Sequence, residues 1–175
     1  MREIVEDLGP VQLARFAVTD FDDVHAFASH PLVCADTTWG PNDADDTRAF
    51  LDEAGRSRPG TVLLAVVRED RVIGSASVWT TSQEDRTGEL GYALHPDVWG
   101  RGYATLVTRA LLRRGFTDLG LERIAATCGP TNTRSARVLE KAGLRLEGHP
   151  RGHKRVRGAR RDSLVFARLV TDAEP

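Results

Sequence analysis

The segment Trp99–Thr105, with the sequence Trp-Gly-Arg-Gly-Tyr-Ala-Thr, has residue types that could bind a charged ligand. The alternating segment Gly88–Leu94 before it predicts a strand, and the run 104–116 after it predicts an amphipathic helix. A glycine-rich turn between a strand and a helix leaves backbone N–H groups unpaired at the positive end of the helix dipole. Such N–H groups suit a phosphate or a pyrophosphate, so the sequence predicts an anionic ligand here.

Three kinds of glycine turn fit this pattern, and the neighbouring residues help to separate them. A P-loop needs Lys and then Ser or Thr after its last glycine, whereas Gly102 is followed by Tyr103 and Ala104, which argues against nucleotide hydrolysis. A dinucleotide fingerprint needs a third glycine, where this chain has Thr105. The remaining alternative is a tight turn that binds nothing.

The rest of the chain predicts one mixed α/β domain over residues 1–175. Its 41% hydrophobic and 28% charged residues are ordinary for a globular protein. The segments 61–67 and 72–79 predict an antiparallel hairpin. We therefore expect an α/β (α+β) fold with a mixed, mostly antiparallel sheet and helices on both faces. The expected strands are 11–18, 61–67, 72–79, 88–94, 123–128, 144–148 and 162–169, and the expected helices are 19–29, 42–57, 104–116 and 133–142.

Further motifs make the chain resemble the GNAT superfamily of acyl-CoA-dependent N-acetyltransferases. That family's cofactor motif is Gln/Arg-x-x-Gly-x-Gly/Ala; Gly102–Ala104 supplies its second half, and Trp99 replaces the usual Gln or Arg. The glycine turn, together with Asn132–Ser135 and Val138–Leu144, is similar to the RimJ/RimL branch, the ribosomal-protein N-terminal acetyltransferase type. The resemblance is strong over residues 88–165 and implies a single GNAT-fold domain.

The resemblance also implies acetyl-CoA as the cosubstrate. Its pyrophosphate would lie on the N–H groups of about Arg101–Thr105, and its pantetheine arm would run beside Tyr92–Leu94, where this strand separates from 124–128. A backbone N–H near Ala93 or Leu94 would then stabilise the oxyanion formed on the thioester. The implied cofactor-binding residues are Tyr92, Ala93, Leu94, Trp99, Gly100, Arg101, Gly102, Tyr103, Ala104, Thr105 and Asn132.

Acetyl transfer requires that the amine loses a proton and that the departing thiolate is stabilised or protonated. Glu89 is our candidate base, acting directly or through water; the alternative is a carboxylate paired with a surface arginine. Ser135 is our candidate acid or hydrogen-bond donor to the thiol; the alternative, shared with Asn132, is capping of the helix start. Many GNAT enzymes carry a tyrosine acid in this helix where this chain has Leu139, so the general acid is left open.

The acceptor implied by the resemblance is a primary amine, either a protein N-terminus or a small molecule, acetylated directly in a ternary complex. Residues 1–60 carry twelve acidic and five basic side chains, a balance that would attract a cationic substrate, and we expect 36–53 to help form the acceptor side. Residues 151–161 carry six basic and no acidic side chains but no interleaved aromatics, so we expect no nucleic-acid binding. A catalytically silent acyl-CoA-binding module and an RNA- or ribosome-associated module are the alternatives.

Metal and redox chemistry have little support in the sequence. Cys34 and Cys128 lack the spacing of a zinc site or a disulfide scaffold, and His149 and His153 enclose a proline and a glycine rather than a helical face. We expect no metal site and no acetyl-cysteine intermediate at Cys128. No run approaches the roughly 18 apolar residues of a membrane span, so we expect a cytoplasmic protein without membrane contact. A homodimer is left open.

Overall fold

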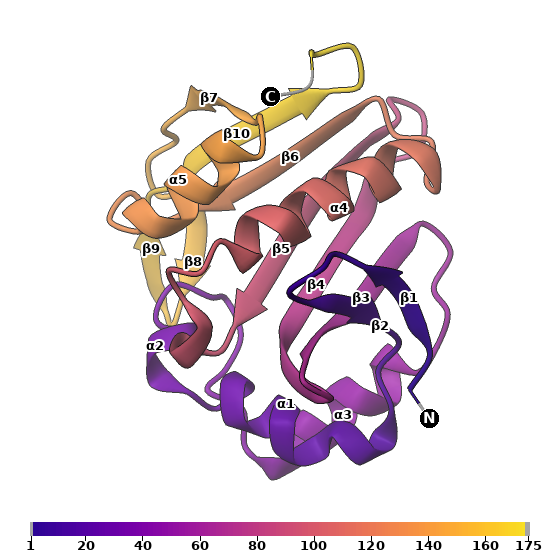
Figure 1. The fold of residues 1–175 in the computed structure, drawn as a ribbon. Helices are drawn as coiled ribbons and strands as arrows, with labels where there is room; N and C mark the ends of the chain where they lie inside the picture. Colours follow the sequence, from indigo (N-terminus) through magenta and orange to yellow (C-terminus); the bar gives the residue numbers. More distant parts are fainter. Residues whose placement is uncertain (1, 174–175) are drawn as a thin grey trace.

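An eight-stranded mixed sheet runs through the computed structural model, which describes residues 2–173 (Figure 1). The strand order is β1-β2-β3-β4-β5-β6-β10-β7, and every neighbouring pair is antiparallel except β5 and β6. The strands are β1 (Ile4–Asp7), β2 (Gln12–Ala14), β3 (Thr61–Arg68), β4 (Arg71–Ser82), β5 (Thr87–Leu94), β6 (Arg123–Cys128), β7 (Arg145–Gly148) and β10 (Leu164–Leu169). The single parallel pair lies in the middle of the sheet, and the functional site is built around it.

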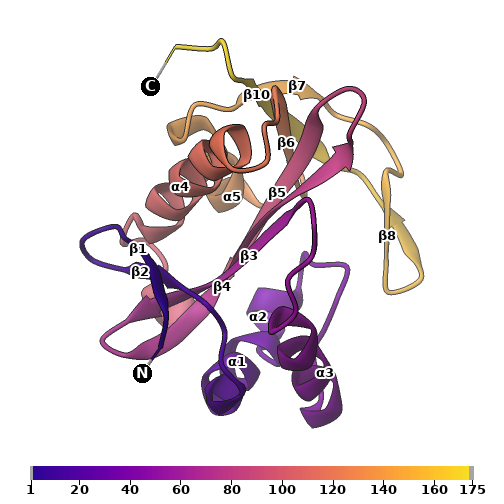
Figure 2. The ribbon, with the colours of Figure 1, turned by 90° about the vertical axis from the view of Figure 1, so that its right-hand side faces the viewer.

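Helices cover both faces of the sheet, as predicted (Figure 2). One face carries α1 (Phe21–Ala28), α2 (Pro31–Cys34) and α3 (Ala44–Ala54), and the other carries α4 (Tyr103–Thr117) and α5 (Thr133–Lys141). The sequence of strand β3 explains why helices pack on both faces of the sheet. Leu64 and Val66 belong to the core under α4, whereas Ala65 and Val67 belong to the core under α1. Successive side chains of a strand point to opposite faces, so a continuous apolar run must be buried on both sides.

The predicted fold class is confirmed, and the predicted elements from 61 to 148 agree with the observed ones to within a few residues. The acidic start of α3 caps the helix. The Asp43 carboxylate accepts hydrogen bonds from the N–H groups of Asp45 and Asp46, at 2.9 and 2.8 Å. These two bonds satisfy donors that the helix itself cannot pair.

The N-terminal region differs from the prediction. The expected strand 11–18 is shorter, because the chain makes two strands, β1 and β2, and turns between them at Gly9, where φ is 87°. Two 3-10 turns, Val18–Asp20 and Pro96–Val98, precede α1 and the glycine turn. Pro31 begins the short helix α2, which was not among the predicted helices, at a position where its missing N–H costs nothing.

The basic stretch 151–161, expected as a loop, forms a second sheet of two strands, β8 (Lys154–Val156) and β9 (Ala159–Arg161). The hairpin is fixed to the segment 34–40 by Arg157. Its guanidinium donates hydrogen bonds to the carbonyl groups of Cys34 at 2.5 Å and Gly40 at 3.2 Å. The positive charge is therefore used to join two segments far apart in the sequence. Within residues 2–173, no helix combines the length and the apolar character needed to cross a bilayer.

Candidate active site

Strands β5 and β6 pair over three positions and then separate. Glu89 opposite Ala125 is the last pair of the ladder, although β5 continues to Leu94 and β6 to Cys128. Beyond that point each strand keeps only its other neighbour: β5 pairs with β4 up to Leu94, and β6 pairs with β10 up to Cys128. Figure 1 shows the two strands diverging toward their C-terminal ends. Alternate N–H and C=O groups of residues 90–94 therefore point into the gap without a strand partner.

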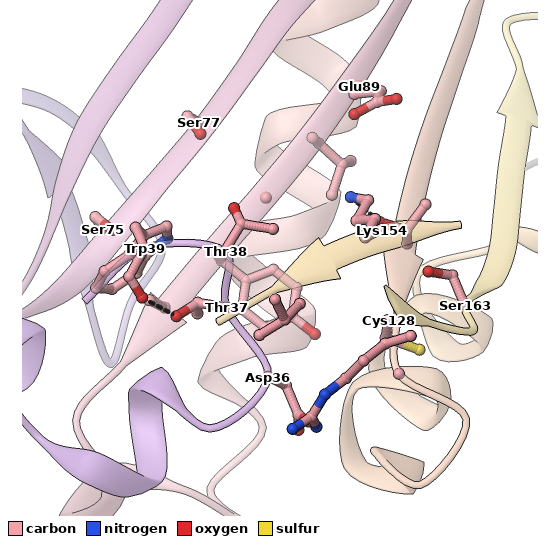
Figure 3. Close-up of a pocket in the computed structure, with 18 of the residues that line it drawn as sticks. Asp36, Thr37, Thr38, Trp39, Ser75, Ser77, Glu89, Cys128, Lys154 and Ser163 are labelled. Atoms are coloured by element: carbon pink, nitrogen blue, oxygen red, sulfur yellow. Dashed lines mark hydrogen bonds between the residues drawn. The ribbon is translucent and has the colours of Figure 1, made fainter. Parts of the chain in front are cut away.

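A cavity of about 340 Å³ opens at this gap (Figure 3). It lies on the face of the sheet that carries α1–α3, the face to which the lining residue Ala93 belongs. Its floor is formed by facing positions of β4 and β5. Trp79 lies opposite Glu89, and Ser75 lies opposite Ala93. The other walls come from three separate elements: the segment 36–39, the C-terminal end of β6 at 127–129, and the β8–β9 hairpin with Lys154, Val156 and Arg161.

The glycine turn lies at the N-terminus of α4 and exposes its backbone. Gly100 and Gly102 have φ values of 78° and 82°, in the left-handed region that other residues avoid. A Cβ on either glycine would meet no atom within 4 Å, so their open sides can receive a ligand. Gly102 is the N-cap residue of α4 and gives it no side-chain cap, and within residues 2–173 the N–H groups of Tyr103 and Ala104 have no hydrogen-bond partner. These features fit a bound pyrophosphate.

The comparisons with known proteins identify the family. The family model of the acetyltransferase (GNAT) domain matches residues 11–145. The chain belongs to the GNAT acetyltransferase family. It is 30% identical, over 136 residues, to the uncharacterized N-acetyltransferase YnaD of Bacillus subtilis; the alignment covers 78% of this chain and 79% of YnaD. Alignments with other Bacillus relatives cover 54% to 64% of those proteins.

Solved GNAT structures have the same fold. A GNAT-family acetyltransferase from Bacillus anthracis is 29% identical and superposes with a TM-score of 0.82 over 97% of this chain and 98% of its own. Mycobacterium smegmatis RimJ in complex with CoA-disulfide is 22% identical, with a TM-score of 0.79 over 99% of this chain and 88% of its own. The predicted membership of the GNAT superfamily is thereby confirmed, and RimJ shares its fold. This GNAT chain is an N-acetyltransferase.

Glu89, the predicted base, lines the cavity of this GNAT fold at the point where the two strands separate (Figure 3). Its side chain is half-buried, and no cation of residues 2–173 lies within ion-pair distance of its carboxylate. The alternative of a pair with a surface arginine is therefore not observed. An unpaired carboxylate in a cleft is placed to accept a proton.

Ser135, the predicted acid, lies near Tyr92 and is not among the residues that line the cavity. The Ser135 N–H donates to the Asn132 carbonyl oxygen Oδ1 at 3.1 Å, so Asn132 caps α5, as its alternative interpretation proposed. No hydrogen bond of ordinary geometry reaches the buried Tyr92 hydroxyl among residues 2–173, although the Ser135 side chain lies close to it. Burial raises the pKa of Tyr92 to about 12, a rise that nearby Ser135 opposes and nearby Cys128 increases. The structure thus brings Ser135 and Tyr92 together at the bottom of the gap.

Trp99 has a local role that its sequence position did not reveal. Its indole N–H donates to the Leu94 carbonyl at 2.8 Å, and the Arg134 guanidinium lies 5.2 Å from the centre of its ring. Trp99 therefore attaches the glycine turn to the end of β5 and the start of α5. Arg101 is exposed and carries no ion pair among residues 2–173, whereas Tyr103 packs into the core under α4.

Sequence reasoning missed two parts of the site. The phenol of Tyr92 was expected only as a cofactor contact, and the basic hairpin was not expected in a cavity wall. The first has a sequence signal, since Tyr92 stands in a strand beside the glycine turn. The second has none, because Lys154 reaches the cavity only through the pairing of β8 with β9 and the Arg157 contacts.

Proposed function

We propose that this enzyme transfers an acetyl group from acetyl-CoA to a primary amine within a ternary complex, and that residues 1–175 act as one domain. The observation that carries the proposal is the separation of β5 from β6 beside the uncapped N-terminus of α4. Acetyl-CoA supplies the thioester carbonyl that the amine attacks. The turn 100–104 would bind its pyrophosphate, and the unpaired backbone of 90–94 would hold its pantetheine arm.

Glu89 acts as the base in this proposal. It accepts the ammonium proton, directly or through a water molecule, and frees the lone pair that forms the new C–N bond. An N–H group of the β5 edge near Ala93 or Leu94 donates to the carbonyl oxygen as negative charge develops there. The C–S bond then breaks, the sulfur leaves as a thiolate, and the amide nitrogen loses its second proton to water.

The thiolate is stabilised by hydroxyl groups at the bottom of the gap. A phenol with a pKa of about 12 stays protonated at neutral pH, and it holds its proton more tightly than an ordinary thiol with a pKa near 8.5. Tyr92 therefore donates a hydrogen bond to the thiolate rather than losing its proton to it. Ser135, beside Tyr92, assists as a second hydroxyl. The transfer is direct, because burial raises the pKa of Cys128 to about 11 and keeps its thiol protonated and weakly nucleophilic.

The variant Glu89→Gln tests the assignment of the base. Free-thiol release from acetyl-CoA with a panel of amines should fall about 100-fold in kcat, the usual range for a lost general base. The dissociation constant of acetyl-CoA, measured by calorimetry, should stay within about twofold, because Glu89 lies on the acceptor side of the gap. Glu84→Gln, in the exposed turn before β5, is the matched control. Equal rates for Glu89→Gln and wild type across the pH range would remove Glu89 from the mechanism.

A further inference from the structure

The β8–β9 hairpin directs two cations into the acceptor cavity. Lys154 and Arg161 are direct partners across the hairpin, and both line the cavity. The next pair, Arg155 and Arg160, points to the other side of the hairpin. Each of these two donates to a hairpin carbonyl, Arg155 to Gly158 at 3.2 Å and Arg160 to Gly152 at 3.0 Å. The hairpin thus has one basic face turned outward and one turned toward the cavity.

The two cavity-facing cations, Lys154 and Arg161, have no anionic partner in the part of the chain that the structure describes. Within residues 2–173 no carboxylate lies within ion-pair distance of Lys154 or Arg161. Lys154 is half-buried, and its ammonium donates only to the neutral Thr127 hydroxyl, at 2.6 Å. Like charges directly opposite one another on paired strands destabilise the pairing. Their retention beside a cleft indicates that an external anion is their partner.

The carboxylates that share the cavity have other positions or other partners. Asp162 accepts a hydrogen bond from the Gly152 N–H at 2.8 Å, which holds the hairpin to its own base. Glu89 lies on β5, in the floor of the cavity and on the same side of the view as Lys154, but the two form no ion pair (Figure 3). Asp36 lies on the segment 36–39 near Gly129. The cavity is therefore lined by a proton acceptor on the sheet and by two cations on the hairpin.

The phosphate groups of acetyl-CoA are not the anion that would bind Lys154 and Arg161. Figure 2 shows α4, whose N-terminus holds the glycine turn, and β8 on opposite sides of the sheet. The hairpin faces the acceptor side of the gap instead. Resting on the proposed function, we propose that the acceptor is a small amine that also carries a carboxylate, an amino-acid-like zwitterion. Its ammonium group lies at Glu89, and its carboxylate pairs with Lys154 and Arg161. The ammonium group of such an acceptor still agrees with the expectation that the acidic N-terminal region attracts a cationic substrate.

A matched substrate series tests this proposal. Thiol release from acetyl-CoA is measured with the common L-amino acids, with their α-carboxamides, and with the corresponding decarboxylated amines. Wild type should prefer the best acid over its carboxamide by about 10-fold or more in kcat/KM, as expected for a charge-assisted contact. Lys154→Gln should remove most of that preference by lowering kcat/KM for the acid while changing the carboxamide by less than about twofold. Lys154→Arg should restore it.

The control is Arg155→Gln, one residue along the same strand and facing away from the cavity, which should leave both rates unchanged. Equal use of acids, carboxamides and amines by wild type would overturn the proposal and leave the acetyltransferase function standing. An equal loss for acid and carboxamide in Lys154→Gln would show a purely structural lysine and would also overturn it.

If no amine supports thiol release, the proposed function fails, and calorimetry then decides the further inference separately. In that experiment the same acids and carboxamides are titrated into the CoA-loaded protein. Binding of an acid that Lys154→Gln abolishes supports the anion site. Failure of every acid to bind more tightly than its carboxamide rejects the site.

Discussion

Replacing Tyr92 with phenylalanine removes one hydroxyl group from the bottom of the gap. The variant separates the effect of this hydroxyl on the stability of the fold from its effect on the rate of the reaction. The hydroxyl is buried without a hydrogen-bond partner among residues 2–173. An unsatisfied buried polar group costs about 1–3 kcal/mol. Tyr92→Phe should therefore raise the free energy of unfolding at pH 7.5 by about 1 kcal/mol or more, measured by urea denaturation. The same variant should lower kcat about 10- to 100-fold, because the thiolate loses a charge-assisted hydrogen bond.

The pH dependence gives a second, quantitative check on the same variant. Burial raises the pKa of Tyr92 to about 12 in the folded protein, above the ordinary value of about 10 for an unfolded chain. The fold thus favours the protonated phenol, and this contribution is complete below about pH 9 and is lost as the pH rises toward 12. Relative to Tyr92→Phe, wild type should lose about 0.4 kcal/mol by pH 10 and about 1.4 kcal/mol by pH 11.

Other groups titrate equally in both proteins, so the difference between them isolates Tyr92. Two results would refute this reasoning. A Tyr92→Phe variant that is less stable than wild type at pH 7.5 would mean that the hydroxyl makes a stabilising hydrogen bond. A kcat within twofold of wild type would mean that the phenol does not contact the leaving sulfur.

Two further predictions concern the turn and the thiol. Trp99→Phe should lower the free energy of unfolding by about 1–2 kcal/mol, because the Leu94 carbonyl loses its indole donor. The same variant should weaken acetyl-CoA binding measured by calorimetry. Unchanged stability and affinity would show that the glycine turn keeps its conformation without this hydrogen bond. Cys128 should react slowly with iodoacetamide at pH 8, and acetyl-CoA alone should leave no acetyl group on the protein by intact mass spectrometry, because the raised pKa keeps the thiol protonated. A stoichiometric acetyl-enzyme would contradict direct transfer.

The sequence predicted most of the elements that carry cofactor chemistry. The strand β6, the helices α4 and α5 and the glycine turn depend on local patterns, namely period-2 and period-3.6 hydrophobicity and glycines at left-handed positions. The same local patterns placed Glu89 and Ser135 on the elements where they are found. Their neighbours were harder to predict, because the separation of β5 from β6 arises from pairing with β4 and β10, which lie at distant sequence positions.

The acceptor side was predicted least well. Its walls come from the segment 36–39 and from the hairpin 154–161, which are joined by the Arg157 hydrogen bonds to carbonyl groups of 34–40. Six basic residues without periodicity indicate a loop, and no local pattern shows which of them turn inward. The inward direction of Lys154 follows from the two-residue alternation of a strand that the sequence did not reveal.

The most direct test of the central claim is isotope transfer from acetyl-CoA labelled in its acetyl group. The protein is incubated with this cosubstrate and the panel of amines, and the products are analysed by mass spectrometry. The account predicts an N-acetylated amine that carries the label, formed in equal amount to free CoA, with a rate that falls about 100-fold in Glu89→Gln. Tight acetyl-CoA binding without any labelled amide would contradict it, because the gap between β5 and β6 would then bind the cofactor without catalysing transfer.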